Sequence, residues 1–404
     1  MIRISTSYTQ EQGVQYMRDA QKRVVDTQAE LATGKRISSP SDDPVGAARL
    51  IDLHHQIDST ARFQTNIAMA TGRLATSDSI LDEAGQLTQR ARELVVQANN
   101  APLADSDRVS IAQELRQIRG QLLEHANSKD GNGDYLYAGY RTQTAPFIET
   151  TGGQVVYQGD SGQRLLGIAP TRSVAVSDAG DSVFMNIRAG NGVFATTADA
   201  GNSGSAVIEP GDVLDPTAFE HHRFQIDFQS STDFTITDLS EVPPTGPGPV
   251  QTLPADGRIE FNGISVKLTG APANGDRFEV APAPYQDAFT TLDKVITALE
   301  TPVAATGAAR TKFAQTMADA MQNLDQMHSN FLDTRTQIGA RLNGLETQES
   351  ANSEFSLRMQ SIANDIEGLD YAEASSRLAA YTLTLQAAQQ SYVKIQNLNL
   401  FNYL

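Results

Sequence analysis

Residues 378–404 read LAAYTLTLQAAQQSYVKIQNLNLFNYL, and this stretch decides the fold. Its apolar side chains recur at alternating spacings of three and four residues, which places them on one narrow stripe of a helix. The stripe consists of six residues, Leu378, Tyr381, Leu385, Ala388, Tyr392 and Ile395, and Leu398 extends it. Burying six such side chains contributes roughly 6–12 kcal/mol, whereas ordering some two dozen backbone residues costs about 25 kcal/mol before hydrogen bonds offset part of it. We therefore expect a helix that is marginal alone and needs a partner stripe.

A second stripe lies at the other end of the chain. It consists of Val14, Met17, Val24 and Leu31, with Gln21 and Gln28 at the seam positions between them. Matched seams predict that the two ends of the chain pair, either within one subunit or between neighbours. Both stripes are short and rich in small or amide side chains, so we expect them to order poorly in solution and to lock only in an assembly. We therefore assign both stripes to a subunit interface.

Composition excludes several classes of protein. A chain of 404 residues predicts two or three domains. The net charge of -17 argues against a nucleic-acid partner, and the absence of cysteine excludes disulfides and thiolate metal sites. The first residues, MIRISTSYTQEQG, lack the build of a signal peptide, and no apolar run is long enough to span a bilayer. We expect no membrane insertion, and any export to proceed without a cleavable signal peptide.

The first half of the chain is dominated by helical patterns. We expect a helix over residues 9–32 that stops at Gly34, because glycine commonly ends helices. Asp43 followed by Pro44 is typical of a helix start, with the aspartate as N-cap. The apolar pattern then continues over residues 45–98, which predicts one long helix.

Helix returns in the last third of the chain. After a short helix from Tyr285 to Pro302, a heptad pattern runs to Leu369, and we place Phe355 and Ile362 on its apolar seam. The seams over residues 67–95 and 313–331 are expected to form internal core. Polar residues interrupt the last seam and are expected to fix its register at some cost in stability. They are Thr334, Arg341, Gln348 and Asn352.

Between these helices the pattern is that of strands. After a shorter helix from Asp107 to about Ala126, an attached β element is predicted. Its strands are DYLYAGYRTQTAPF (134–147), QVVYQGD (154–160) and RSVAVS (172–177). Residues 180–282 are almost wholly β-like, and Asn262-Gly263 separates two alternating runs, which is the strongest short hairpin signal.

The order of these patterns defines the fold class. Helical arms on both sides of a β insert predict an α+β protein: a long antiparallel α-helical bundle, or coiled-coil rod, formed by the N- and C-terminal arms, with a central β-rich insert domain. The expected domains are an N-terminal arm (1–40), the first half of the bundle with the attached β element (41–180), a β-rich outer domain (181–282), the second half of the bundle (283–368) and a C-terminal arm (369–404).

Several stretches resemble one known family. LATGKRISSPSDDPVGAARL (31–50) and IANDIEGLDYAEASSRLAAYTLTLQAAQQSYVKIQNLNLF (362–401) are similar to the N- and C-terminal motifs of the flagellin family. Within that family, GAPANGDRFEV (270–280) resembles a motif of hook-associated members. The final LFNYL, NGDYLYAGYRTQTAPF (132–147) and YQGDSG (157–162) resemble the hook-filament junction type, FlgL. The resemblance covers both helical arms strongly and the β insert more weakly.

The resemblance implies a structural axial protein of the bacterial flagellum, an adaptor that joins hook to filament by coupled folding and helical self-assembly of its terminal helices. It implies as partners further copies of the chain, other hook-associated proteins and flagellin. It also implies export to the extracellular flagellum through the type III apparatus, with a cytoplasmic chaperone holding the C-terminal helix. Two alternatives stay open: filament flagellin itself, and an extracellular enzyme or adhesin carried on a flagellin-like scaffold.

Short motifs that suggest chemistry each have a plainer interpretation. GDSG (159–162) resembles a serine-protease nucleophile loop but is followed by Gln163 rather than glycine, so we interpret it as a turn. Asp130, Asn132 and Asp134 begin like a calcium loop that Tyr135 does not continue, which favours a solvated turn. His221 and His222 are adjacent, and adjacent strand residues point to opposite faces. We therefore predict no enzyme activity, no catalytic residues, no metal site and no cofactor.

Overall fold

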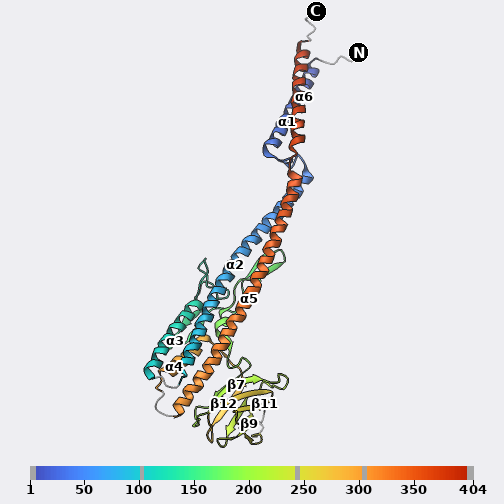
Figure 1. Cartoon of the computed structure of the whole chain (residues 1–404). Coiled ribbons are helices and arrows are strands. Elements are labelled where there is room, and N and C mark those ends of the chain that lie inside the picture. Colours follow the sequence, from blue (N-terminus) through green and yellow to red (C-terminus); the bar gives the residue numbers. More distant parts are fainter. Residues whose placement is uncertain (1–5, 101–103, 242–245, 303–306, 398–404) are drawn as a thin grey trace, which may run out of the picture. The chain divides into compact units, whose positions relative to one another are not determined.

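The computed structural model describes residues 6–100, 104–241, 246–302 and 307–397 (Figure 1). Its helices are α1 (Thr6–Thr33), α2 (Pro44–Ala98), α3 (Asp105–Ala126), α4 (Ala288–Glu300), α5 (Gly307–Glu367) and α6 (Tyr371–Asn397), with a π-helical turn, η1 (Asp181–Met185). Its strands are β1 (Phe147–Glu149), β2 (Val155–Tyr157), β3 (Leu165–Ala169), β4 (Arg172–Ala175), β5 (Ile187–Arg188), β6 (Phe194–Ala198), β7 (Val207–Val213), β8 (Phe224–Phe228), β9 (Asp233–Asp238), β10 (Gln251–Thr252), β11 (Arg258–Phe261), β12 (Ile264–Thr269), β13 (Arg277–Pro282) and β14 (Tyr285–Gln286). The chain divides into two compact units, residues 1–65 with 347–404, and residues 66–346. The predicted fold class is confirmed.

In the first unit, α1 and α6 lie side by side (Figure 1). Gly34 ends α1 with a φ of 69°, a left-handed conformation that glycine adopts without steric penalty. The carboxylate of Asp43 accepts a hydrogen bond from the Gly46 amide at 2.9 Å, and Pro44 is the first residue of α2. Both boundaries predicted from the sequence are therefore confirmed.

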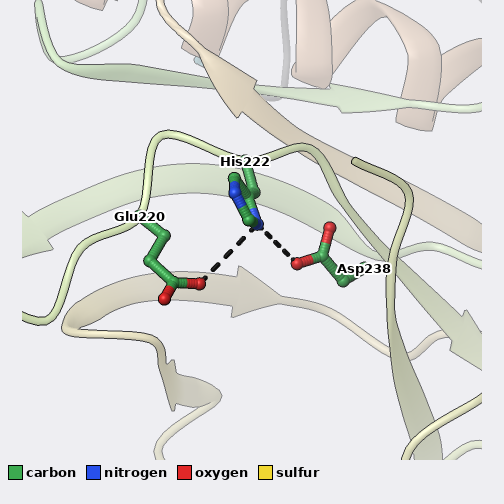
Figure 2. A group of neighbouring side chains, drawn as sticks. All are labelled: Glu220, His222 and Asp238. Atoms are coloured by element: carbon green, nitrogen blue, oxygen red, sulfur yellow. Dashed lines mark hydrogen bonds and ion pairs between the residues drawn. The ribbon is translucent and has the colours of Figure 1, made fainter. Parts of the chain in front are cut away.

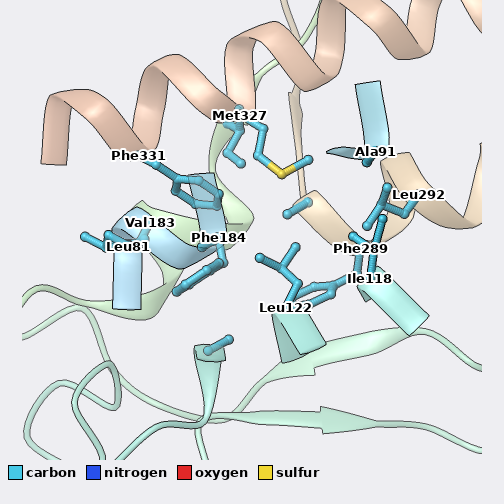
Figure 3. Close-up of a cluster of buried hydrophobic side chains, with 14 of the residues drawn as sticks. Leu81, Ala91, Ile118, Leu122, Val183, Phe184, Phe289, Leu292, Met327 and Phe331 are labelled. Atoms are coloured by element: carbon cyan, nitrogen blue, oxygen red, sulfur yellow. The ribbon is translucent and has the colours of Figure 1, made fainter. Parts of the chain in front are cut away.

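The second unit holds the main apolar core, among α2, α3, α4 and α5 (Figure 3). Leu81 and Val95 of α2 are fully buried there, as the seam over residues 67–95 predicts. Phe184 of η1 packs between two other rings, with its centre 5.5 Å from that of Phe147 and 5.4 Å from that of Phe331 on α5. The attached β element and the helices therefore share one core.

Of the four polar residues predicted in the α5 seam, two are buried and two, Arg341 and Gln348, are half-buried. Thr334 and Asn352 are 9% and 7% exposed. The Arg341 guanidinium donates hydrogen bonds to both carboxylate oxygens of Asp178, each at 2.9 Å. Because this bidentate contact has one geometry, it fixes the register of α5 against the segment that follows β4.

The placement of Phe355 and Ile362 on the α5 seam is wrong. They are 41% and 39% exposed, and the neighbouring positions Ser356 and Ala363 turn inward instead. An α-helix has 3.6 residues per turn, so a seam counted in strict heptads drifts by about 20° per heptad unless the helix supercoils fully. Phe331, Ile338, Leu345 and Asn352 keep the heptad spacing and stay buried, so the change of phase comes beyond Asn352, where the supercoil no longer holds the heptad in place.

The strand predicted over residues 134–147 is also wrong, except for Phe147 at the start of β1. Its backbone makes turns instead: the Arg141 amide donates to the Ala138 carbonyl at 3.2 Å, and Gly139 has a φ of 67°. Tyr137 lies in this segment and is fully buried in the helical core. A turn-rich backbone delivers this side chain to the core, and neither strand propensity nor alternation reveals that.

The insert is a β-sandwich with its own apolar core. A five-stranded sheet, in the order β10-β9-β8-β13-β6, faces a three-stranded sheet, β11-β12-β7. β8 alternates as predicted, with Phe224, Ile226 and Phe228 buried. The β11–β12 hairpin turns at Asn262 and Gly263, with φ angles of 46° and 73°, so the predicted turn is confirmed.

Amide side chains of α5 bind the edge of this sandwich. The Gln315 side-chain amide donates to the Ile208 carbonyl of β7 at 2.8 Å and accepts from the Ile208 amide at 2.9 Å. It thus makes the two hydrogen bonds that a residue of a neighbouring strand would make. Asn323 accepts from the Gly190 amide at 3.0 Å. Both side chains are buried, and these bonds tie the insert to the bundle within the second unit.

Candidate assembly interface

The two terminal stripes face each other across the α1–α6 pair. Each of the stripe residues whose side chains the structure describes is half-buried: Val14, Met17, Val24, Leu31, Leu378, Tyr381, Leu385, Ala388 and Tyr392. The helices approach closely, since a Cβ added to Gly13 would lie 3.1 Å from the Tyr392 ring. The structure thus has the ends paired within one chain, one of the two arrangements that the sequence left open. The Ile395 side chain and Leu398 lie outside the described residues.

Charged side chains flank this seam. Arg377 of α6 donates to the Glu30 carboxylate of α1 at 3.0 Å. The Arg23 guanidinium lies 5.9 Å from the centre of the Tyr381 ring, within the range of a cation–π contact. Both contacts are partly exposed, so they set the register of the pair more than its strength.

The prediction that Gln21 and Gln28 occupy the seam is wrong, because both are exposed. Ala20 and Thr27 hold those positions, 8% and 3% exposed, and Ala374 of α6 is fully buried. Small side chains let the two helices approach, whereas a buried amide would lose its hydrogen bonds to water. The Thr27 hydroxyl avoids this cost by donating to the Arg23 carbonyl at 2.8 Å. Small residues at the three-four spacing were the signal that the sequence reading missed.

The helix ends near Gly34 and Gly368 are tied together by backbone hydrogen bonds. The Arg36 amide donates to the Glu367 carbonyl at 2.7 Å, and the Leu369 amide donates to the Gly34 carbonyl at 3.1 Å. The Lys35 ammonium reaches the Glu367 carboxylate at 2.9 Å. These bonds place the starts of α6 and α2 at a defined junction.

Large apolar side chains remain on the outer faces of the pair. They are Tyr8, Tyr16 and Val25 of α1 and Tyr371, Leu383 and Val393 of α6, each more than half exposed. Leu383, 68% exposed, is the most exposed of these six. None of the described helices is long and apolar enough to cross a membrane. The side chains at the fully buried positions of the seam are small, whereas many of the large apolar side chains of these helices face outward.

The turn that begins at Asp130 is exposed over residues 131–133, as predicted, but the Asp130 carboxylate itself is buried. The Asp130 carboxylate pairs with the Arg73 guanidinium of α2, and both side chains are less than 10% exposed. The same carboxylate accepts hydrogen bonds from the amides of Asn132 at 2.9 Å and Asp134 at 3.0 Å. A carboxylate engaged by arginine holds the turn against α2, and this accounts for the calcium-like spacing without a cation.

His222 lies in a group that has the composition of a metal site (Figure 2). Its Nδ1 atom is 2.7 Å from the Asp238 carboxylate and 3.6 Å from the Glu220 carboxylate. The hydrogen bond with Asp238 raises the pKa of His222. His221, by contrast, packs against Phe219, with ring centres 4.6 Å apart. The two histidines thus have different surroundings, and His222 is accompanied by its near neighbour Glu220 and by Asp238, which lies 16 residues away.

A cavity of about 690 Å³ lies between α4, α5 and the edge of the sandwich. Asp319 of α5 lines it and accepts a hydrogen bond from Gln315 at 2.8 Å. Burial raises the pKa of Asp319 to about 6. A raised pKa means that the folded protein binds this proton more tightly than the unfolded chain, so the stability contributed by Asp319 falls as the pH rises through this value.

Replacing Asp319 with asparagine should therefore stabilise the protein above pH 6. The amide keeps an oxygen for Gln315 and carries no charge, so we expect a gain of about 2 kcal/mol at pH 7.5 and no gain at pH 4. Urea denaturation of both proteins across pH 4–8 measures this. Asp333→Asn, at an exposed position of the same helix, is the matched control. A gain that does not vary with pH would show that the ionisation of Asp319 is not its cause.

Comparison with known proteins gives a consistent answer. Models described as bacterial flagellin N-terminal helical region and flagellar hook-associated protein 1, D2-like domain match residues 4–142 and 197–282. Flagellar hook-associated protein 3 of Escherichia coli is 26% identical over 400 residues, which is 99% of either chain. The crystal structure of the flagellar junction protein FlgL from Legionella pneumophila is 31% identical, covers 80% of this chain and 100% of that one, and has a TM-score of 0.69. Flagellin of Listeria monocytogenes is 27% identical, but over 36% of this chain and 52% of its own length.

A helical bundle formed from both ends of the chain, with paired terminal helices and a β-sandwich insert, defines a flagellin-like structural protein of the flagellum. Hook-associated protein 3 matches the chain over nearly its whole length, whereas flagellin matches about a third. The chain belongs to the flagellar hook-associated protein 3 (FlgL) family. The resemblance expected from the terminal motifs is confirmed, and filament flagellin is the weaker alternative.

Proposed function

We propose that the chain is the adaptor between hook and filament, and that copies associate through their paired terminal helices. One observation carries this proposal: the large apolar side chains on the outer faces of α1 and α6, with Leu383 68% exposed. The seam of the pair fully buries only small side chains, so the pair is weakly stabilised alone. Association with neighbouring copies adds apolar burial and completes the ordering of both helices. The Legionella relative is itself described as a junction protein.

We assign the stripe residues, from Val14 to Leu31 and from Leu378 to Leu398, to this assembly interface. They form the seam that holds α1 against α6 and so positions the outer faces of the pair. The five expected domains are part of the same proposal. Load would pass from the terminal arms into α2 and α5, and the amides of Gln315 and Asn323 would hold the outer domain to α5. These roles require no catalytic group, and we propose that the chain is not an enzyme.

The proposed partners are further copies of the chain, other hook-associated proteins and flagellin. Membership in a flagellar family supports assembly with flagellar components. Export through the type III apparatus without a cleavable signal peptide, with a chaperone bound to the C-terminal helix, and a final location in the extracellular flagellum belong to the same proposal.

A deletion strain tests the adaptor role. A bacterium that lacks this chain should complete its hook and release unpolymerised filament protein into the medium. Supplying the intact chain should restore filaments and motility. A strain that still builds filaments without the chain would contradict the adaptor role, and a strain that releases no filament protein would favour filament flagellin.

The same strain tests whether the sandwich carries a separate activity. The Ala189 amide donates to the Pro284 carbonyl at 2.9 Å, so these residues can be joined by a short Gly-Ser linker with residues 190–283 removed. We expect this variant to restore most of the motility, because the bundle and the terminal helices remain. Restored filaments together with loss of surface adhesion or of a hydrolytic activity would favour the enzyme or adhesin alternative.

A further inference from the structure

The group formed by Glu220, His222 and Asp238 lies where the connection between β7 and β8 passes the end of β9 (Figure 2). The Nδ1 atom of His222 faces both carboxylates, at 2.7 Å from Asp238 and 3.6 Å from Glu220. The three ligand atoms lie within 4.8 Å of one another. One nitrogen and one oxygen from the connection between β7 and β8 thus meet one oxygen from the end of β9.

The charge of this group is unbalanced. The carboxylates of Glu220 and Asp238 both lie beside the single imidazole of His222. The adjacent Arg223 does not compensate them, because its guanidinium is engaged by Glu279 at 2.6 Å. With His222 neutral, as a metal ligand must be, these three side chains carry a net charge of about -2 at neutral pH. A divalent cation would neutralise that charge.

We propose that Glu220, His222 and Asp238 form a binding site for a divalent transition-metal ion of the Zn²⁺ class. An imidazole nitrogen favours zinc and its neighbours in the first transition row over calcium or magnesium, which prefer oxygen ligands alone. Tetrahedral zinc with ligands at about 2.1 Å places those ligands about 3.4 Å apart. The observed separations from the imidazole nitrogen, 2.7 Å and 3.6 Å, bracket that value, and no two of the three ligand atoms are more than 4.8 Å apart, so side-chain shifts of about 1 Å would complete the site. Water would fill the remaining position.

The ion would hold the segment before β8 to the end of β9. Glu220 and His222 belong to the long connection between β7 and β8, and Asp238 is the last residue of β9. An ion that binds the folded sandwich but not the unfolded chain raises its stability by mass action. The two side chains on the connection are partly or largely exposed, so the ion can enter without opening the sandwich.

Titration of the full-length chain with ZnCl₂ at pH 7.5, followed by calorimetry, tests the proposal. The neighbouring histidines supply a matched pair of variants. His222→Ala should weaken the site at least tenfold and remove one equivalent of bound zinc, whereas His221→Ala should leave affinity and stoichiometry unchanged. The other histidines of the chain are present in both variants, so nonspecific binding cancels in the comparison.

Glu220→Gln guards against loss of binding through misfolding. The Glu220 side chain is 66% exposed, so its replacement should leave the circular dichroism spectrum and the melting temperature of the zinc-free protein unchanged while weakening zinc binding at least fivefold. Equal zinc binding by His222→Ala and the parent protein would overturn the proposal, and so would equal loss in His221→Ala. Unchanged zinc affinity in Glu220→Gln would show that this carboxylate is not a ligand, and it would overturn the proposed site.

Discussion

Replacing Leu383 with aspartate should yield a folded, soluble subunit that no longer supports filament growth. Leu383 is 68% exposed in the isolated chain, so its replacement removes little packing within the subunit. If the outer face of α6 is covered by a neighbouring copy, the aspartate must lose its water there, and an unpaired buried charge prevents association. Electron microscopy of the complemented deletion strain should show hooks with almost no filaments.

Two further variants of the same helix serve as comparisons for Leu383→Asp. Gln389→Asp, at an exposed polar position, should support normal filaments. Leu385→Asp, in the half-buried seam, should also abolish filaments, but by separating α1 from α6, so the helical circular dichroism signal of the free subunit should fall. Normal filaments with Leu383→Asp would place the intersubunit contact elsewhere.

Replacing Arg341 with alanine should destabilise the protein by about 3–5 kcal/mol. The Asp178 side chain is 6% exposed, and its carboxylate accepts two hydrogen bonds of 2.9 Å from the Arg341 guanidinium. Without Arg341 the carboxylate stays buried with only a 3.3 Å bond from Gln163, which costs more than the ion pair itself contributes. The urea midpoint of the purified chain measures the loss.

Arg92→Ala is the control for this change. Arg92 and Asp325 form an ion pair at 2.6 Å between side chains that are about half exposed, and such pairs contribute less than about 1 kcal/mol. Adding Asp178→Asn to Arg341→Ala should recover part of the lost stability, because a neutral amide costs less to bury than a carboxylate. An effect of Arg341→Ala no larger than that of Arg92→Ala would contradict the role given to the buried pair.

Features that depend on local chemistry could be predicted from the sequence. Gly34, Asp43 and the Asn262-Gly263 turn act through backbone conformation and short-range hydrogen bonds, which the residue types specify by themselves. The terminal stripes could be predicted for a similar reason, because apolar spacing places residues on one face of a helix whatever packs against it.

Features that depend on distant partners could not be predicted. Phe355 lies outside because the phase of a long helix is set by its supercoil, which spacing alone does not give. The spacing of apolar residues predicts Gln21 in the seam, but Ala20 occupies that position. How closely two helices approach depends on the side chains of both helices, which the spacing on one helix does not give. Asp238 lies 16 residues from His222 and joins it only through the fold of the sandwich, so the sequence did not reveal this group.

Hydrogen exchange of the α1 and α6 amides, in free subunits and in assembled ones, tests the central claim most directly. The account predicts that both helices exchange quickly in the free subunit, while the buried amides of α2 and α5 in residues 66–346 stay protected, and that assembly slows exchange in α1 and α6 by orders of magnitude. Terminal helices already as protected in the free subunit as the core of α2 would contradict it.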